Sequence, residues 1–335
     1  MAELPDPRGE LSEYLLRELR SPVHGLRAPG VTSPADPLAD EDLQLALYCC
    51  YELHYRGFDE VDDNWEWEPS LLAFRGELER IFEAAVRDAV GSYPDAIPAE
   101  ESDSALRAIA AADDSPSLSQ HLAREGTRDE LLEFVVHRSA YQLKEADPHS
   151  WALPRIFGPP KAALVEVQAD EYGGGRPERI HAELFARSME ALGLDSTYGA
   201  YLERIPGPTL ATVNLMSLFG LHRRLRGAIV GHLALFEMTS SIPNGRYATA
   251  LRRLGYDGAA TDFFDEHVEA DAVHENIAAV DLAGGLIRQD PALGPDILFG
   301  ASALVELDGR WATWVLERWR QGNSSLRAPA ALAAA

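Results

Sequence analysis

Apolar residues recur at three- and four-residue intervals along most of the chain, which is the spacing of one face of an α-helix. No series of alternating strands joined by hairpin turns is visible. The pattern therefore predicts an all-α protein. Helices are expected within residues 40–57, 69–91, 128–145, 160–170, 178–193, 223–239, 261–287 and 297–320.

Local signals agree with these helices. Thr127 and Glu130 have the spacing of a capping box, and Pro177 stands where first-turn prolines occur. Helix ends are indicated by Asp147-Pro148 and by Pro243-Asn244-Gly245. Residues 1–125 are interpreted as an N-terminal helical extension, 126–322 as a helical bundle and 323–335 as a disordered tail.

Composition narrows the class of protein. The chain has 335 residues, 46% of them hydrophobic, and a formal net charge of −24. This charge would repel nucleic acid and anionic membranes, so neither is an expected partner. The N-terminus lacks the pattern of a secretory signal, and no apolar run approaches about 18 residues. The adjacent Cys49 and Cys50 are poorly placed for a disulfide, so a cytoplasmic location is predicted.

The most informative motif is the triplet His267, Asp271 and His274 inside an apolar helical segment. Offsets of four and seven residues return all three side chains to one helix face. Two imidazoles and one carboxylate are what a helix offers to a non-haem iron atom. The triplet therefore predicts part of a metal site.

Glu237 is the second candidate, because it lies in a segment that is otherwise almost uncharged. A buried carboxylate is costly unless it is paired or bound to metal. A bridging metal carboxylate explains its position. The alternative is an ion pair with an arginine such as Arg246.

Glu171 and His181 are separated by nine residues that include Gly173–175. In an ideal helix this offset would misalign the two side chains by about 80°. The glycines could break the helix and bring both side chains to one centre. A plain helix–turn–helix with a solvated Glu171 is the alternative. Glu145 ends a predicted helix and is weakly supported on its own, because Lys-Glu-Ala-Asp before proline is usually an exposed helix end.

Taken together, Glu145, Glu171-x9-His181, Glu237 and His267-x3-Asp271-x2-His274 resemble the ligand series of the haem-oxygenase-like di-iron oxidases and oxygenases, also called iron-containing redox enzymes. The segments 51–58 and 171–184 look like signatures of bacterial members. The resemblance covers roughly residues 126–290. It implies a seven-helix haem-oxygenase-like fold that binds two irons rather than haem.

The resemblance also implies roles. Glu145, His181 and His274 would serve one iron, Glu171, His267 and Asp271 the other, and Glu237 would bridge them. Residues 126–322 would form the di-iron domain.

Glu171 is similar to the extra carboxylate of family members that oxygenate amine or guanidine nitrogens. The expected enzyme uses O2, a small-molecule substrate and an external electron donor. Oxidative C–C cleavage or desaturation of an amino acid or fatty acid is an alternative. A non-catalytic haem- or ligand-binding helical protein is another. The N-terminal extension could supply the interface of a homodimer.

Overall fold

The computed structural model describes residues 2–27, 29–94 and 96–328, without the side chains of residues 269–273. The described residues are mainly helical and form no β-strand; one isolated bridge joins Ala2 and Phe58. The all-α prediction is confirmed. Every described helix is too short or too polar to span a bilayer.

The α-helices, with 3-10 turns between several of them, are α1 (Glu10–Leu19), α2 (Glu41–Glu52), α3 (Pro69–Val90), α4 (Ser102–Ala111), α5 (Leu118–Arg124), α6 (Arg128–Gln142), α7 (Asp147–Ser150), α8 (Gly158–Glu171), α9 (His181–Ala191), α10 (Gly207–Leu221), α11 (Arg226–Arg253), α12 (Asp262–Asn276), α13 (Gly285–Gln289) and α14 (Gly294–Arg320). A π-helical segment, Ile277–Gly284, joins α12 to α13.

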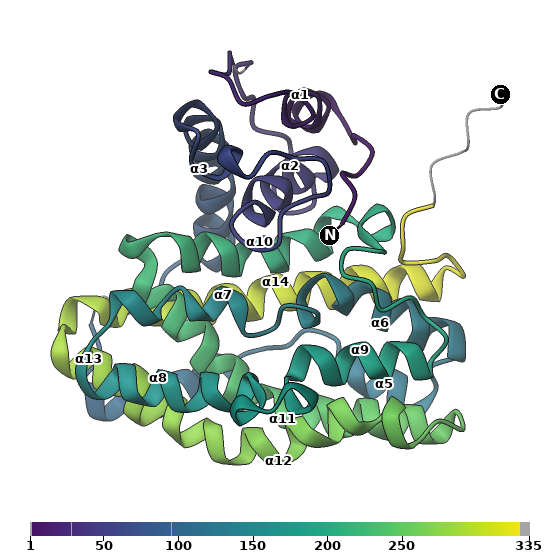
Figure 1. The fold of residues 1–335 in the computed structure, drawn as a ribbon. Coiled ribbons are helices and arrows are strands. Elements are labelled where there is room, and N and C mark those ends of the chain that lie inside the picture. Colours follow the sequence, from purple (N-terminus) through teal and green to yellow (C-terminus); the bar gives the residue numbers. More distant parts are fainter. Residues whose placement is uncertain (1, 28, 95, 329–335) are drawn as a thin grey trace.

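The helices form a bundle with a smaller layer on one side. In Figure 1 the purple and dark blue helices α1, α2 and α3 gather above α10, and α2 packs against α10. Below them α11 packs against both α12 and α14. The helices α4 and α5 contact α11 as well, so part of the region 1–125 lies directly against the bundle. The boundary at residue 125 stays a prediction.

Two features of the helices differ from the expectation. The predicted stop at Pro243 is wrong, because α11 continues to Arg253. Proline removes one backbone donor from a helix, but burial of Tyr247 and Leu251 further along holds the helix together. The helix α10 was not expected, because it is apolar on almost all sides and therefore lacks the periodicity of an amphipathic helix.

The chain after α14 also differs from the disordered tail expected from residue 323. The Ser325 side chain is fully buried, and its hydroxyl donates to the Glu133 carboxylate at 2.6 Å. The Arg327 backbone N–H donates to the Arg204 carbonyl at 2.9 Å. These contacts order the chain to Arg327, and residues 329–335 lie outside the described part.

Candidate metal centre

A glycine loop brings Glu171 and His181 together. The helix α8 ends at Glu171, and α9 begins at His181. Gly173–175 have φ angles of 69°, 59° and 80°, in the left-handed region. A Cβ atom on Gly173 would lie 2.6 Å from the backbone of Arg179 and Ile180. The chain folds back here, and Glu171 Oε2 lies 3.0 Å from His181 Nδ1. The expected break at the glycines is confirmed.

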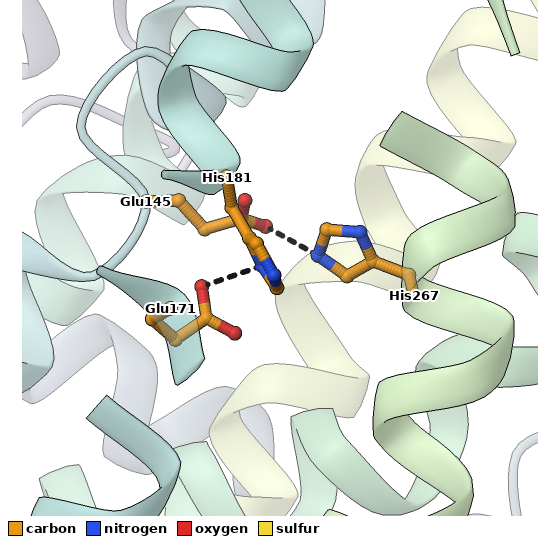
Figure 2. Close-up of side chains that lie close together, drawn as sticks. All are labelled: Glu145, Glu171, His181 and His267. Atoms are coloured by element: carbon orange, nitrogen blue, oxygen red, sulfur yellow. Dashed lines mark ion pairs between the residues drawn. The ribbon is translucent and has the colours of Figure 1, made fainter. Parts of the chain in front are cut away.

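Glu145 and His267 join this pair from two other segments. Glu145 lies in the turn between α6 and α7 rather than on the predicted helix, and it is 3% exposed. His267 comes from α12, and its Nε2 lies 3.5 Å from Glu145 Oε1. Figure 2 shows all four side chains pointing toward one another. One ligand atom from each lies within 4.8 Å of the others.

Glu237 and His274 form the second part of the site. Glu237 lies on α11, and its Oε2 is 3.3 Å from His274 Nδ1 on α12. Glu171 completes this group, again with ligand atoms within 4.8 Å of one another. Glu171 therefore belongs to both groups. Arg246, the alternative partner considered for Glu237, instead donates to the hydroxyls of Ser117 and Ser119.

The structure groups the residues differently from the expected division between two irons. His274 lies with Glu237 and Glu171, whereas Glu145 and His181 lie with His267 and Glu171. Asp271, the remaining expected ligand, has a side chain outside the described residues. The other six candidates come together at one buried place.

Hydrogen bonds orient two of the imidazoles. Nδ1 of His267 lies 2.8 Å from the Phe263 carbonyl, which can only accept, so this nitrogen carries the proton and Nε2 faces Glu145. Nε2 of His274 lies 2.9 Å from Asp170 Oδ2, and Nδ1 faces Glu237. A second hydrogen bond of this kind is typical of metal-binding histidines, because it fixes the ring and raises its basicity.

Asp170 was missed by the sequence reasoning. Its carboxylate is largely exposed, so it lacks the buried position that singled out the other acids. The local signal available was its place directly before Glu171 on the last turn of α8.

The site concentrates buried negative charge. Glu145, Glu171 and Glu237 are each less than 8% exposed. Burial would raise the pKa of Glu171, but the nearby imidazoles, His181 first, lower it to about 2. Burial would lower the pKa of His274, but Glu237 and Asp170 raise it to about 9.

Among the described residues, Glu145 Oε2 has no hydrogen-bond partner. Buried carboxylates require compensating positive charge. Carboxylate and imidazole donors together suit a divalent iron ion, and the donor set therefore fits the metal that the sequence predicts.

The neighbouring histidines have other roles. His149 lines the space between the candidate ligands, and its Nε2 lies 3.1 Å from His232 Nδ1. The two ring nitrogens of His137 contact the hydroxyls of Thr209 and Ser325. Burial lowers the pKa of all three histidines. They are therefore neutral side chains near the site or behind it.

Known proteins are similar to parts of this chain. The chain is 29% identical over 161 residues to the nitrosourea synthase of Streptomyces achromogenes subsp. streptozoticus. That match covers 47% of this chain and 34% of the synthase, so the chain spans about a third of the length of this relative. Residues 132–309 match the sequence profile of the family described as iron-containing redox enzyme. The profile covers more than half of the chain and includes every candidate ligand from Glu145 to His274. The chain belongs to the family of iron-containing redox enzymes.

Proposed function

We propose that this protein is an O2-dependent, non-haem di-iron oxidoreductase that adds oxygen to an amine or guanidine nitrogen of a small metabolite. One observation carries the proposal. Three buried carboxylates and three buried imidazoles converge from α8, α9, α11, α12 and the turn after α6. Haem needs no such set of donors, whereas a pair of carboxylate-bridged irons does.

The candidate ligands would be divided between the two metal ions. Glu145, His181 and His267 would bind on one side, and Glu237 and His274 on the other. Glu171 belongs to both groups, which supports it as a carboxylate shared by two ions. The sequence-based hypothesis gives the bridging role to Glu237 and adds Asp271 as a ligand. The hydrogen bonds from His267 to Phe263 and from His274 to Asp170 would hold the imidazoles in place.

Two bound ferrous ions would supply the reactivity toward O2. Amino-acid side chains alone do not have this reactivity. One oxygen atom would enter an N–H bond of the substrate to give N–OH. The other would leave as water after uptake of two protons and two electrons, which an external donor must provide. Bulky residues around the site, Tyr141, Leu233 and Phe236, would limit access of bulk water.

Oxygenation of nitrogen is the finer part of the proposal. It is supported by the likeness to an enzyme named nitrosourea synthase and by the presence of Glu171 in the ligand series. Because the match covers about a third of that enzyme, its substrate is not assigned to this chain.

Anaerobic loading with ferrous iron tests the metal centre. The expected result is close to two irons per chain, without the absorbance of a porphyrin. The substitutions His267→Ala and Glu237→Ala should each lower the iron content. His121→Ala and Glu125→Ala remove an ion pair near the surface and serve as matched controls. Iron content that does not differ between the two sets would overturn the ligand assignment.

Turnover tests the reaction. The iron-loaded protein is exposed to O2 and a reductant with a panel of amines, amino acids and fatty acids, and products are analysed by mass spectrometry. N-oxygenation adds one oxygen atom to a nitrogen-bearing substrate. Loss of a carbon fragment or of two hydrogens would instead support cleavage or desaturation. A protein that binds no iron would favour a non-catalytic role.

A further inference from the structure

A chain of aromatic rings leads from the candidate metal centre to the surface of the protein. It begins at the candidate ligand His267, whose ring centroid lies 4.3 Å from that of Phe263. The next rings follow with centroids between 4.2 and 6.4 Å apart, in the order Phe263, Phe264, Tyr247, Phe134 and Trp311. The His137 ring then connects Trp311 to Trp314, at 5.8 and 6.3 Å. These spacings are those of aromatic side chains in direct contact.

Most of this aromatic chain is shielded from water. The rings from Phe263 to Trp311 are each at most 7% exposed, whereas Trp314 is half-buried. Part of the chain also forms a wall of a cavity of about 230 Å³ that Arg138 lines as well. Indole and phenol rings give up an electron far more easily than phenyl rings. Tyr247, Trp311 and Trp314 are therefore the positions that can be oxidised, and the other rings bridge the gaps between them.

The two tryptophans of the chain have different electrostatic surroundings. The Arg138 guanidinium lies 4.5 Å from the centroid of the Trp311 ring. Trp311 Nε1 donates to the Thr209 hydroxyl at 3.0 Å. A hydroxyl is a poor base, so an oxidised Trp311 would keep its proton and place a positive charge beside Arg138. Trp314 instead lines an open surface hollow with Arg310 and four acids, Asp113, Asp114, Glu306 and Glu317. Coulomb interactions therefore favour oxidation of Trp314 over oxidation of Trp311.

The proposed reaction gives such a route a use. When O2 oxidises the irons while no substrate is bound, the oxidised centre can take electrons from the protein. The side chains nearest to it are its own ligands, and His267 is both a candidate ligand and the first ring of the chain. A supply of electrons along the chain would spare these ligands.

We propose that the aromatic chain is a protective electron route from Trp314 to the metal centre. In each event the centre gains one electron, which Trp311 and Tyr247 pass on. Trp314 loses that electron, and its indole N–H proton leaves to the solvent of the hollow, which gives a neutral indolyl radical. A small thiol returns a hydrogen atom to Trp314, and two of the resulting thiyl radicals combine to a disulfide. The inference rests on the proposed function, because it concerns O2 chemistry at that centre.

A photochemical experiment tests the route in the metal-free protein. A ruthenium polypyridyl complex is attached through Ile242→Cys, because Ile242 is 68% exposed and stands on α11 five positions before Tyr247. The native Cys49 and Cys50 are buried and should not take the label. A light flash and a cobalt(III) ammine quencher convert the label to ruthenium(III), which takes an electron from the protein. Transient absorption should show a tryptophan radical whose long-lived signal is lost in Trp314→Phe.

Two further substitutions test the order of the route. Trp311→Phe places a ring that is much harder to oxidise between Tyr247 and Trp314, so the Trp314 radical should form at least about tenfold more slowly. Trp319→Phe on the same helix α14 is the matched control, because the Trp319 ring contacts His121 and not the chain. Thermal unfolding of each variant checks the fold. Where Trp311→Phe unfolds, Tyr247→Phe interrupts the route nearer to the label and should slow the radical in the same way.

Exposure of the iron-loaded protein to O2 without substrate tests the protective role. Peptide mass spectrometry should find added oxygen at Trp314, and less of it when a small thiol is present. In Trp311→Phe, oxidation should move to peptides that carry ligands such as His267. The iron content of Trp311→Phe should then fall faster over successive exposures than that of Trp319→Phe.

The outcomes separate this inference from the proposed function. Equal rates of Trp314 oxidation in labelled Trp311→Phe and Trp319→Phe would overturn the route, whether or not the protein binds iron. Iron uptake followed by the same O2 damage in both variants would overturn the protective role and leave the metal centre intact. A protein in which the label oxidises Trp314 through Trp311, but which takes up no iron, would keep the electron route and overturn the di-iron proposal.

Discussion

The helix α6 and the turn after it present two faces with opposite character. His137 and Lys144, seven residues apart, form what we call the closed face. Arg138, Gln142 and Glu145 form the open face. On both faces the side chains lie in the interior of the protein or line its cavities. The two faces differ in whether other residues of the protein supply hydrogen-bond or ion-pair partners for these side chains.

On the closed face every polar group has a partner. The Lys144 ammonium group is fully buried and lies 2.6 Å from Glu52 Oε2. The Tyr198 hydroxyl donates to the same carboxylate at 2.7 Å, and the Tyr55 ring centroid lies 4.3 Å from the Lys144 nitrogen. Both ring nitrogens of His137 have hydroxyl partners, at 2.8 and 2.9 Å.

On the open face, two buried polar atoms lack hydrogen-bond partners among the described residues: Gln142 Oε1 and Glu145 Oε2. The Arg138 guanidinium lies 4.5 Å from the centroid of the Trp311 ring. Buried polar groups stabilise a fold only when they are fully satisfied. On the closed face, Lys144 therefore holds α2 of the N-terminal layer against the bundle, whereas the open face leaves polar atoms that a ligand could satisfy.

The largest expected effect is on the closed face. Glu52→Gln leaves the Lys144 charge buried without its counter-ion, so it should lower the free energy of unfolding by about 3–5 kcal/mol. Urea unfolding of the metal-free protein measures this loss. The double substitution Glu52→Gln with Lys144→Met removes both charges and should recover part of the stability. A loss below about 1 kcal/mol for Glu52→Gln would show that the closed face does not stabilise the fold.

The second prediction concerns the pH dependence of the closed face. Burial lowers the pKa of His137 to about 3, against about 6.5 in the unfolded chain. The folded protein therefore keeps a neutral imidazole. This contribution to stability is fully present above pH 6.5 and is lost as the pH falls toward 3. The loss between pH 6.5 and pH 4 should be about 3 kcal/mol.

His137→Gln provides the comparison, because glutamine keeps hydrogen-bonding groups but does not titrate. The variant is expected to be less stable at pH 7 and to depend less on pH than the unsubstituted protein. Urea unfolding at pH 7, 5.5 and 4 measures both. Parallel pH profiles for the two proteins would refute the role of His137.

Sequence reasoning found the other candidate ligands of the metal centre more readily than either face of α6. Glu171, Glu237 and the two α12 histidines stand out because acids and imidazoles interrupt apolar helical patterns. Glu145 was weakly supported, because Lys-Glu-Ala-Asp before proline is typical of an exposed helix end. The turn is buried because residues distant in sequence, such as Glu52, cover Lys144. Local patterns do not contain such contacts.

The same limit applies elsewhere in the fold. The helix α10 is too uniformly apolar to show a periodicity, and α11 passes through Pro243 because of burial further along. Arg138 and Asp308 lie far apart in sequence and line the same cavity. Metal ligands on several helices can be predicted from single residues of the sequence. The lining of a pocket cannot, because it depends on how those helices pack.

The smallest expected effect on the stability of the metal-free protein is that of Glu145→Gln on the open face. It is directly comparable with Glu52→Gln, because both substitutions replace a glutamate by glutamine. Glu145→Gln removes a buried negative charge whose Oε2 has no hydrogen-bond partner among the described residues, so the metal-free protein should be unchanged or more stable by up to about 1 kcal/mol. Ferrous iron at 100 times its Kd should stabilise the unsubstituted protein by about 2.7 kcal/mol, and Glu145→Gln should lose most of that gain. Anaerobic urea unfolding with and without iron measures both quantities. If Glu145→Gln destabilises the metal-free protein as much as Glu52→Gln does, the two faces do not differ, and Glu145 is a structural residue rather than a metal ligand.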